Sequence, residues 1–184
     1  MIWPFSRRRR ASTSRPNDPN ERCAIIQFES EGKPAAWMIN RALDGCAEHD
    51  VYTWHLRIDI EMQEIVEPIR FPTQQEQVAL TELRQKLESN LKASDNARFL
   101  GSLTYYGIRT LLYRVRDAES ANAYLAAVVA DAAPPRVMQY VMQPDAAWAL
   151  AKPYFEAVTR AAADPTVAQA RMERRGNQTV IVEE

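Results

Sequence analysis

Three polar side chains that could do chemistry alternate along one short segment: His55, Arg57 and Asp59. Because alternate residues of a β-strand point to the same side, a strand here would present all three together. In such a row Arg57 would hold an anion and His55 would exchange a proton near neutral pH. The alternative, which we favour, is a solvated polar face of the kind that antiparallel strands normally turn to water.

Other catalytic patterns are weak. The sequence holds no GxGxxG, GxxxxGK[ST], HExxH or GxSxG pattern. An SxxK match at 89–92 and an SDN match at 94–96 adjoin at the end of one predicted helix, whereas enzymes that use this pair bring it together from distant segments. Cys46, His49 and Asp50 are too few for a zinc site. We therefore predict no catalytic, metal or cofactor-binding residue, and favour a protein that is not an enzyme.

The elements that would position the polar row can be read from its surroundings. An apolar row on the other side of the same segment predicts a strand buried on one face: Tyr52, Trp54, Leu56, Ile58 and Ile60. Thr73 and Glu76 fit a capping box, and leucines at helical spacing then predict a helix over 73–92.

Further along, segments 98–106 and 108–116 around Gly107 predict an antiparallel hairpin. Asp117 is a candidate cap for a second helix, and 136–143 reads as another strand. A last helix is expected to open at 144–145, with Trp148 and Phe155 as anchors and a kink at Pro153.

This order of elements predicts an α+β fold. Strand, helix, strand, strand, helix, strand is the ferredoxin-like (split βαβ) arrangement, an antiparallel sheet with two helices on one face. An N-terminal hairpin over 24–43 and a C-terminal helix would be added to it. We expect a disordered basic arm at 1–22, one domain at 23–163 and a tail at 164–184, whose strand-like end has no evident pairing segment.

Several of these segments resemble a known family. The residues are the 101–109 run GSLTYYGIR, Arg116-Asp117-Ala118, the path from Gly32-Lys33-Pro34 to Asn40, the strand around Trp54, and Asp145 three residues before Trp148. Over about 32–155 the chain resembles the bacterial domain of unknown function family 695. Members sometimes occur beside a domain similar to the regulator of ribonuclease activity B, which inhibits by binding an enzyme. The resemblance therefore implies a protein-binding role and supplies no catalytic residues.

Charge and composition favour a cytoplasmic protein with one unusual end. The net charge is −1, and the order of charge and apolar residues at the N-terminus differs from that of a signal peptide. The arm, however, combines aromatic residues with a run of arginines: Trp3, Phe5, Arg7, Arg8, Arg9 and Arg10. Such an arm could hold the protein at the inner membrane or bind nucleic acid through phosphates.

Our leading hypothesis is a non-catalytic protein-binding or regulatory module. Its candidate surfaces are the sheet face of His55, Arg57 and Asp59, and the hairpin turn with Tyr105, Tyr106 and Arg109. The alternatives are membrane or polyanion association through residues 1–10, and a small enzyme that uses the polar sheet face. The identity of a protein partner is open at this point.

Overall fold

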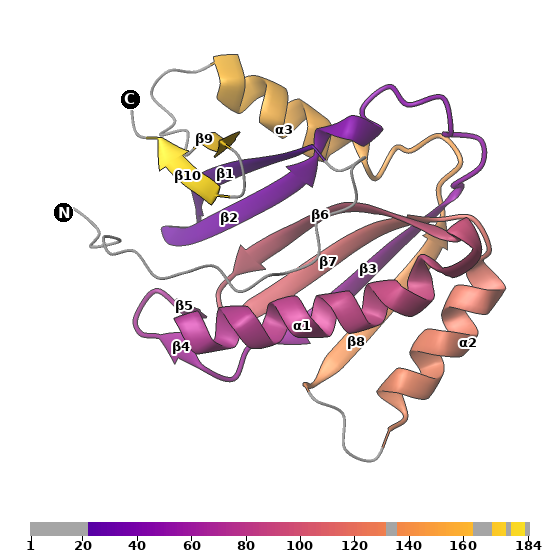
Figure 1. The fold of residues 1–184 in the computed structure, drawn as a ribbon, viewed down its shortest axis with the longest axis horizontal. Coiled ribbons are helices and arrows are strands. Elements are labelled where there is room, and N and C mark those ends of the chain that lie inside the picture. Colours follow the sequence, from indigo (N-terminus) through magenta and orange to yellow (C-terminus); the bar gives the residue numbers. More distant parts are fainter. Residues whose placement is uncertain (1–21, 132–135, 164–170, 176–177, 183–184) are drawn as a thin grey trace.

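The computed structural model describes residues 22–131, 136–163, 171–175 and 178–182. Its centre is one antiparallel sheet in the order β1-β2-β6-β7-β3-β8 (Figure 1). These strands are β1 (Cys23–Ser30), β2 (Lys33–Asn40), β3 (Trp54–Glu61), β6 (Ala97–Tyr105), β7 (Ile108–Val115) and β8 (Met138–Pro144). The predicted α+β class with a large antiparallel sheet is confirmed.

The sheet is wider than predicted. The N-terminal hairpin forms around the turn Glu31-Gly32, where both residues have positive φ. Its second strand then pairs with β6, with Trp37 opposite Leu103 and Ile39 opposite Gly101. The predicted N-terminal hairpin therefore forms and is part of the main sheet, which has six strands, because β2 completes the backbone hydrogen bonds that β6 would otherwise leave open.

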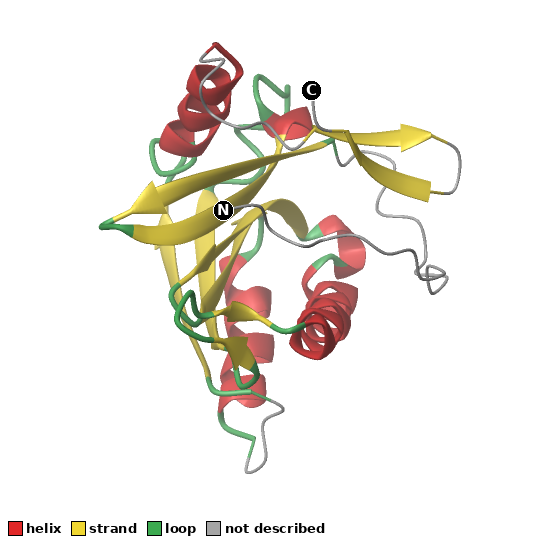
Figure 2. Ribbon diagram, turned by 90° about the vertical axis from the view of Figure 1, so that its left-hand side faces the viewer, coloured by secondary structure: helices red, strands yellow, loops and turns green. Residues whose placement is uncertain are grey.

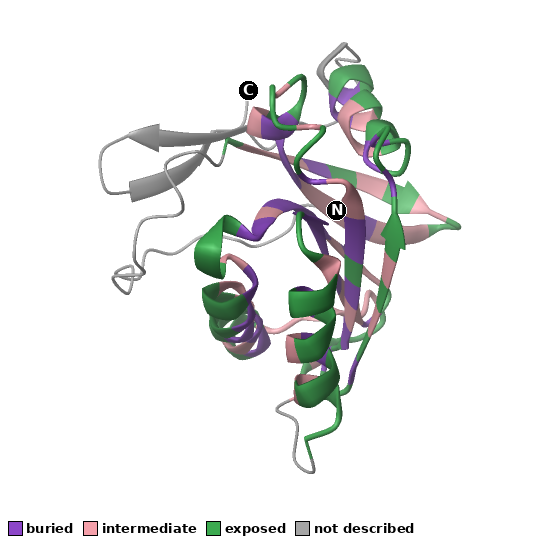
Figure 3. Cartoon of the chain, turned by 90° about the vertical axis from the view of Figure 1, so that its right-hand side faces the viewer, coloured by how far each residue is buried: buried purple, intermediate pink, exposed green. Residues whose placement is uncertain are grey.

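Two helices cover one face of the sheet. They are α1 (Gln74–Leu91) and α2 (Ala118–Val129), and Figure 3 shows both on the same side. The leucines of α1 predicted to share one face are buried together with Leu56, Ile58 and Ile60 of β3. Asp117 caps α2 through the backbone N–H groups of Glu119 and Ser120, as its position predicted.

The start of α1 differs from a capping box in one respect. The Thr73 hydroxyl accepts from the backbone N–H of Glu76 at 3.1 Å, as expected. The carboxylate of Glu76 turns into the protein instead of back to Thr73, whose N–H donates to the Glu64 carbonyl. Glu76 accepts from the backbone N–H of Gln63 and from the guanidinium of Arg136, so it joins three segments of the fold.

The opposite face is covered only in part. Helix α3 (Lys152–Ala163) packs over β1 and β2, with Val158 and Ala161 against Ile26 and Ile39. Figure 2 shows α3 across the sheet from α1. The helix starts at Lys152, which corrects the predicted start at 144–145 and the predicted kink, because Pro153 falls in the first turn, where its missing N–H has no helical partner.

One residue of the predicted apolar row lies on the wrong side. Tyr52 precedes β3 and is buried with Leu112 and Trp148 on the α3 side, whereas Leu56 lies under α1 and α2. Strict alternation therefore holds only from Trp54, where the strand begins. The Tyr52 hydroxyl donates to the Asp95 carboxylate at 2.9 Å.

Two small hairpins and two short helices complete the described chain. The hairpins pair β4 (Ile65–Val66) with β5 (Phe71–Pro72) and β9 (Arg171–Arg175) with β10 (Gln178–Val182), and the 3-10 helices are Arg41–Leu43 and Ala93–Asp95. The strand-like end of the chain thus pairs with β9. The predicted arm at 1–22 lies, except for Arg22, outside the described residues.

Candidate functional site

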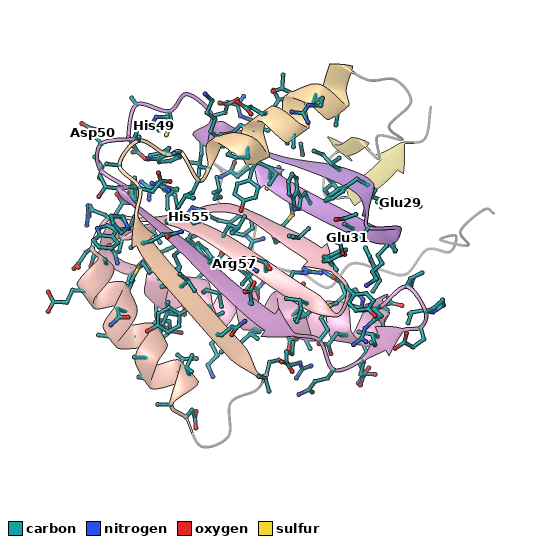
Figure 4. The ribbon with its side chains drawn as sticks, turned by 180° about the vertical axis from the view of Figure 1, so that it is seen from behind. Glu29, Glu31, His49, Asp50, His55 and Arg57 are labelled. Carbon is teal, nitrogen blue, oxygen red and sulfur yellow. The ribbon has the colours of Figure 1, made fainter. Side chains whose placement is uncertain are left out.

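The candidate site is the part of the sheet face that α3 leaves uncovered. Figure 4 views this face, with α3 crossing one end and Arg57 of β3 on the open part. The Arg57 side chain is 56 % exposed and its Nε donates to Asp59 at 2.9 Å. Asp59 also accepts from the Thr110 hydroxyl of β7 at 2.6 Å. The carboxylate is therefore held by two neighbours and the guanidinium remains open to a partner.

His55 does not share this exposure. It is 5 % exposed, and its ring stacks on Tyr154 of α3 at 6.4 Å between centroids. Burial, and then the nearby charge of Arg114, lower the pKa of His55 to about 4. Proton exchange by His55 near neutral pH, which we considered as an alternative, does not fit this pKa, because the ring is neutral at pH 7.

A buried ion pair lies behind His55. The side chain of Arg114 is fully buried and donates to the Asp145 carboxylate at 2.7 Å. Its other nitrogens donate to the backbone carbonyls of Tyr52 and Asp145. Asp145 also accepts from the N–H groups of Ala149 and Leu150 and so shapes the turn that leads to α3. The guanidinium has its partners inside the fold, so this pair holds the fold together.

Beside this pair, a groove runs between α3 and the loop before β3. The His49 ring stacks on Trp148 at 4.1 Å, and the indole N–H donates to the His49 carbonyl. Arg114 lies 4.4 Å from the centroid of the same indole. The groove has a volume of about 520 Å³ and is lined by Asp44, His49, Ala147, Trp148, Lys152, Phe155, Glu156, Thr159 and Arg160.

The residues of the predicted turn patch point in different directions. Tyr105 lies on the open sheet face, and its hydroxyl donates to the Ser30 carbonyl at 3.3 Å. Tyr106 has positive φ in the turn, with Lys33 3.6 Å from its ring centroid. Arg109 turns to the other face and donates to Gln77 of α1 at 2.8 Å. Burial lowers the pKa of Arg109 to about 10. Of these three residues, only Tyr105 therefore lies on the same open sheet face as Arg57 and Asp59.

Sequence reasoning missed three features of this region. Arg114 sits in an apolar strand, and nothing in its spacing indicates that Asp145, 31 residues away, is its partner. Trp37 lies on the same sheet face at the border where α3 crosses it, among aromatic rings, with Phe28 at 5.1 Å and Tyr154 of α3 at 5.3 Å. Leu103 lies in a strand pattern that does not distinguish it from its neighbours, so the sequence did not single it out as a surface residue. The alternation of β2 and β6 could have placed both residues on one face, but only the pairing of these strands brings them together.

Within the part of the chain that the structure describes, no three His, Cys, Asp or Glu side chains gather as metal ligands would. No helix in those same residues is both long and apolar enough to cross a bilayer. The candidate lipid or polyanion arm with Trp3, Phe5 and Arg7 to Arg10 lies outside the described ranges and stays a sequence prediction.

The fold and site define an α+β protein with one wide antiparallel sheet, covered on one face and open on part of the other. Residues 25–156 match the model of a family of unknown function, DUF695, so the chain belongs to that family. The resemblance found in the sequence is confirmed. Neither a search of curated proteins nor a search of solved structures returned a match.

Proposed function

We propose that this protein is a non-catalytic, cytoplasmic protein-binding module whose binding surface is the open sheet face. The observation that carries the proposal is a set of partly exposed apolar side chains on neighbouring strands. Leu103, Tyr105 and Ile108 share this face, and in the described part of the chain they belong to none of the three buried apolar clusters. A water-facing patch of this kind is typical of an interaction site.

The border of the patch has the character of an interface rim. Trp37 adjoins it on one side, opposite Leu103 in the strand register. Asp59 and Thr110 continue the same row across β7 and β3, and Arg57 lies two residues before Asp59 on the same face of β3. Apolar and aromatic contacts at the centre with polar groups around them are the usual composition of a protein interface. Tyr, Trp and Arg are also the residues that most often dominate binding energy.

The chemistry of the polar row supports binding over catalysis. His55 is buried and neutral at pH 7, so it supplies no general acid there. Asp59 is engaged by Arg57 and Thr110. A row in which the base is covered and the carboxylate is paired suits recognition, because its hydrogen bonds position Arg57 for a charged partner group.

We also keep the ferredoxin-like arrangement as part of the proposal. Its support is that β6, β7, β3 and β8 are antiparallel neighbours in that order, with α1 and α2 on one face. The pair β1 and β2 would then be an extension that widens the open face and carries α3.

Affinity capture from lysate of the source organism tests the function. The bait is the full-length tagged protein, captured with nuclease at low and high salt and compared with L103Q/I108Q. The matched control is V78Q/V129Q, which makes equivalent changes at exposed valines on α1 and α2. We expect a salt-resistant protein partner that the control retains and that L103Q/I108Q recovers at least tenfold less. Equal recovery by both variants, or no partner at all, would refute the proposal.

A further inference from the structure

Strand β8 forms one edge of the main sheet, and among the described residues no other strand pairs with its outer side. It pairs with β3 on one side, and it stands at the end of the strand order. At the other end of the sheet, β1 lies against β9. Helix α2 packs against one face of β8, with Asn122 accepting from the Tyr140 hydroxyl at 2.8 Å. Figure 4 views β8 from its other face.

The hydrogen bonds around β8 show which of its backbone groups point outward. The Asp145 N–H donates to Thr53, and the Val137 carbonyl accepts from Glu61, so odd-numbered residues turn their backbone toward β3. Because these directions alternate along a strand, the even-numbered residues turn theirs away from the sheet. Met138, Tyr140 and Met142 therefore offer N–H and C=O groups that no described residue occupies.

Apart from Pro144 at its C-terminal end, this edge lacks the features that normally prevent pairing. Its seven residues, MQYVMQP, hold no charged side chain, and the pairing with β3 runs without a register shift. Natural edge strands are usually blunted by lysines, prolines, inward charges, bulges or a covering segment. Val141 at the middle of β8 is 57 % exposed and Val137 just before it is 59 % exposed. An uncharged strand with an exposed valine at its centre is suited to pair with another strand.

We propose that β8 pairs with β8 of a second copy of this chain, antiparallel and about a two-fold axis at Val141. This register sets Tyr140 opposite the partner's Met142, so their outward N–H and C=O groups exchange hydrogen bonds. Val141 then meets its own copy, and Gln139 lies opposite the partner's Gln143. The two six-stranded sheets join into one continuous sheet.

Self-pairing is favoured over a foreign strand by the sequence of the edge. The strand is complementary to itself in this register, since every pair is apolar with apolar or amide with amide. The end pair of Met138 and Pro144 makes one hydrogen bond fewer, because Pro144 has no N–H. The strand carries no charge that would repel its own copy or select a different partner. The proposal does not rest on the proposed function, because Leu103 and Ile108 lie away from β8.

The test is the solution mass of the full-length protein, measured by light scattering and sedimentation over a range of concentrations. We expect twice the chain mass of 21.0 kDa for the unchanged protein. V141K should weaken the dimer at least tenfold, because two lysines would meet at the axis. M142P should do the same, because it removes an outward N–H and leaves the β3 ladder intact. The control V78K, at a similarly exposed valine on α1, should remain dimeric.

A V141C variant examines the register, since a non-hydrogen-bonded pair brings Cα atoms to about 4.5 Å. It should form a cross-linked dimer under mild oxidation, in a C23S/C46S background, while V78C should not. A monomer at every concentration, or a dimer that survives both V141K and M142P, would overturn the proposal. So would a monomer that gains a foreign peptide strand at β8. L103Q/I108Q should stay dimeric, which separates this result from the test of function.

Discussion

The guanidinium of Arg114 donates to the carboxylate of Asp145 at 2.7 Å, and the two side chains are 0 % and 4 % exposed. The pair ties β7 to the segment that leads into α3, and its other hydrogen bonds reach the backbone of Tyr52. A charge buried this deeply is stable only with its partner, since the low dielectric makes an unpaired charge expensive.

Asp145→Ala should therefore destabilise the fold strongly. It leaves the Arg114 cation buried and also removes the acceptor for the N–H groups of Ala149 and Leu150. We expect a loss of roughly 3–5 kcal/mol in the free energy of unfolding, measured in urea. Arg57→Gln, in the exposed pair with Asp59, is the control and should cost at most about 1 kcal/mol. Similar losses for the two variants would contradict the buried role.

The Glu76 side chain points into the protein, so we expect substitutions of Thr73 and Glu76 to lower the stability of the fold by different amounts. Thr73→Ala removes one cap hydrogen bond and should cost about 1 kcal/mol. Glu76→Ala removes the partner of Arg136 and of the Gln63 N–H, so it should cost about 3 kcal/mol. Thermal unfolding of the two variants checks this order, and equal losses would favour an ordinary capping box.

The lowered pKa of His55 predicts a loss of stability in mild acid. Above pH 6.5 the His55 ring is neutral in both the folded and the unfolded protein. Between pH 6.5 and about 4 the ring is protonated in the unfolded chain and stays neutral in the folded protein. Stability should fall across that window by roughly 2–3 kcal/mol. The groups around the ring are Arg114, Asp145, Arg57 and Tyr154.

His55→Gln isolates this contribution, because carboxylates with lowered pKa, such as Glu76, remain in both proteins. We expect the variant to lose less stability than the parent between pH 7 and pH 4. Unfolding in urea at several pH values measures the difference. Parallel pH curves for parent and variant would show that His55 does not carry the effect.

A substitution at Gly101 tests how closely β2 and β6 approach each other. A Cβ added there would lie 2.4 Å from the Met38 carbonyl oxygen, and a backbone atom cannot move aside easily. Gly101→Ala should therefore cost more than about 2 kcal/mol by overpacking. Gly45→Ala meets no atom within 4 Å and should lose only about 1 kcal/mol, from its positive φ. A variant G101A as stable as G45A would contradict the strand spacing.

Local patterns in the sequence carried much of the fold. Thr73 and the leucine spacing located α1 within a residue or two, Asp117 located α2, and Gly107 located the β6–β7 turn. These predictions succeeded because capping, helical periodicity and turn geometry depend on residues close together in the chain. The start of α3 was missed because it depends on Asp145 being held by Arg114, which lies on a distant strand.

The sequence by itself determined the α+β class, the family and the alternation that separates Leu56 and Ile58 from Arg57 and Asp59. Only the tertiary structure decided which polar residues face water. Helix α3 covers His55 and leaves Arg57 open, β2 joins β6 to widen the sheet, and Arg109 folds beneath α1. The physical reason is that a strand pattern assigns side chains to a face, whereas the exposure of that face depends on which distant segment packs over it.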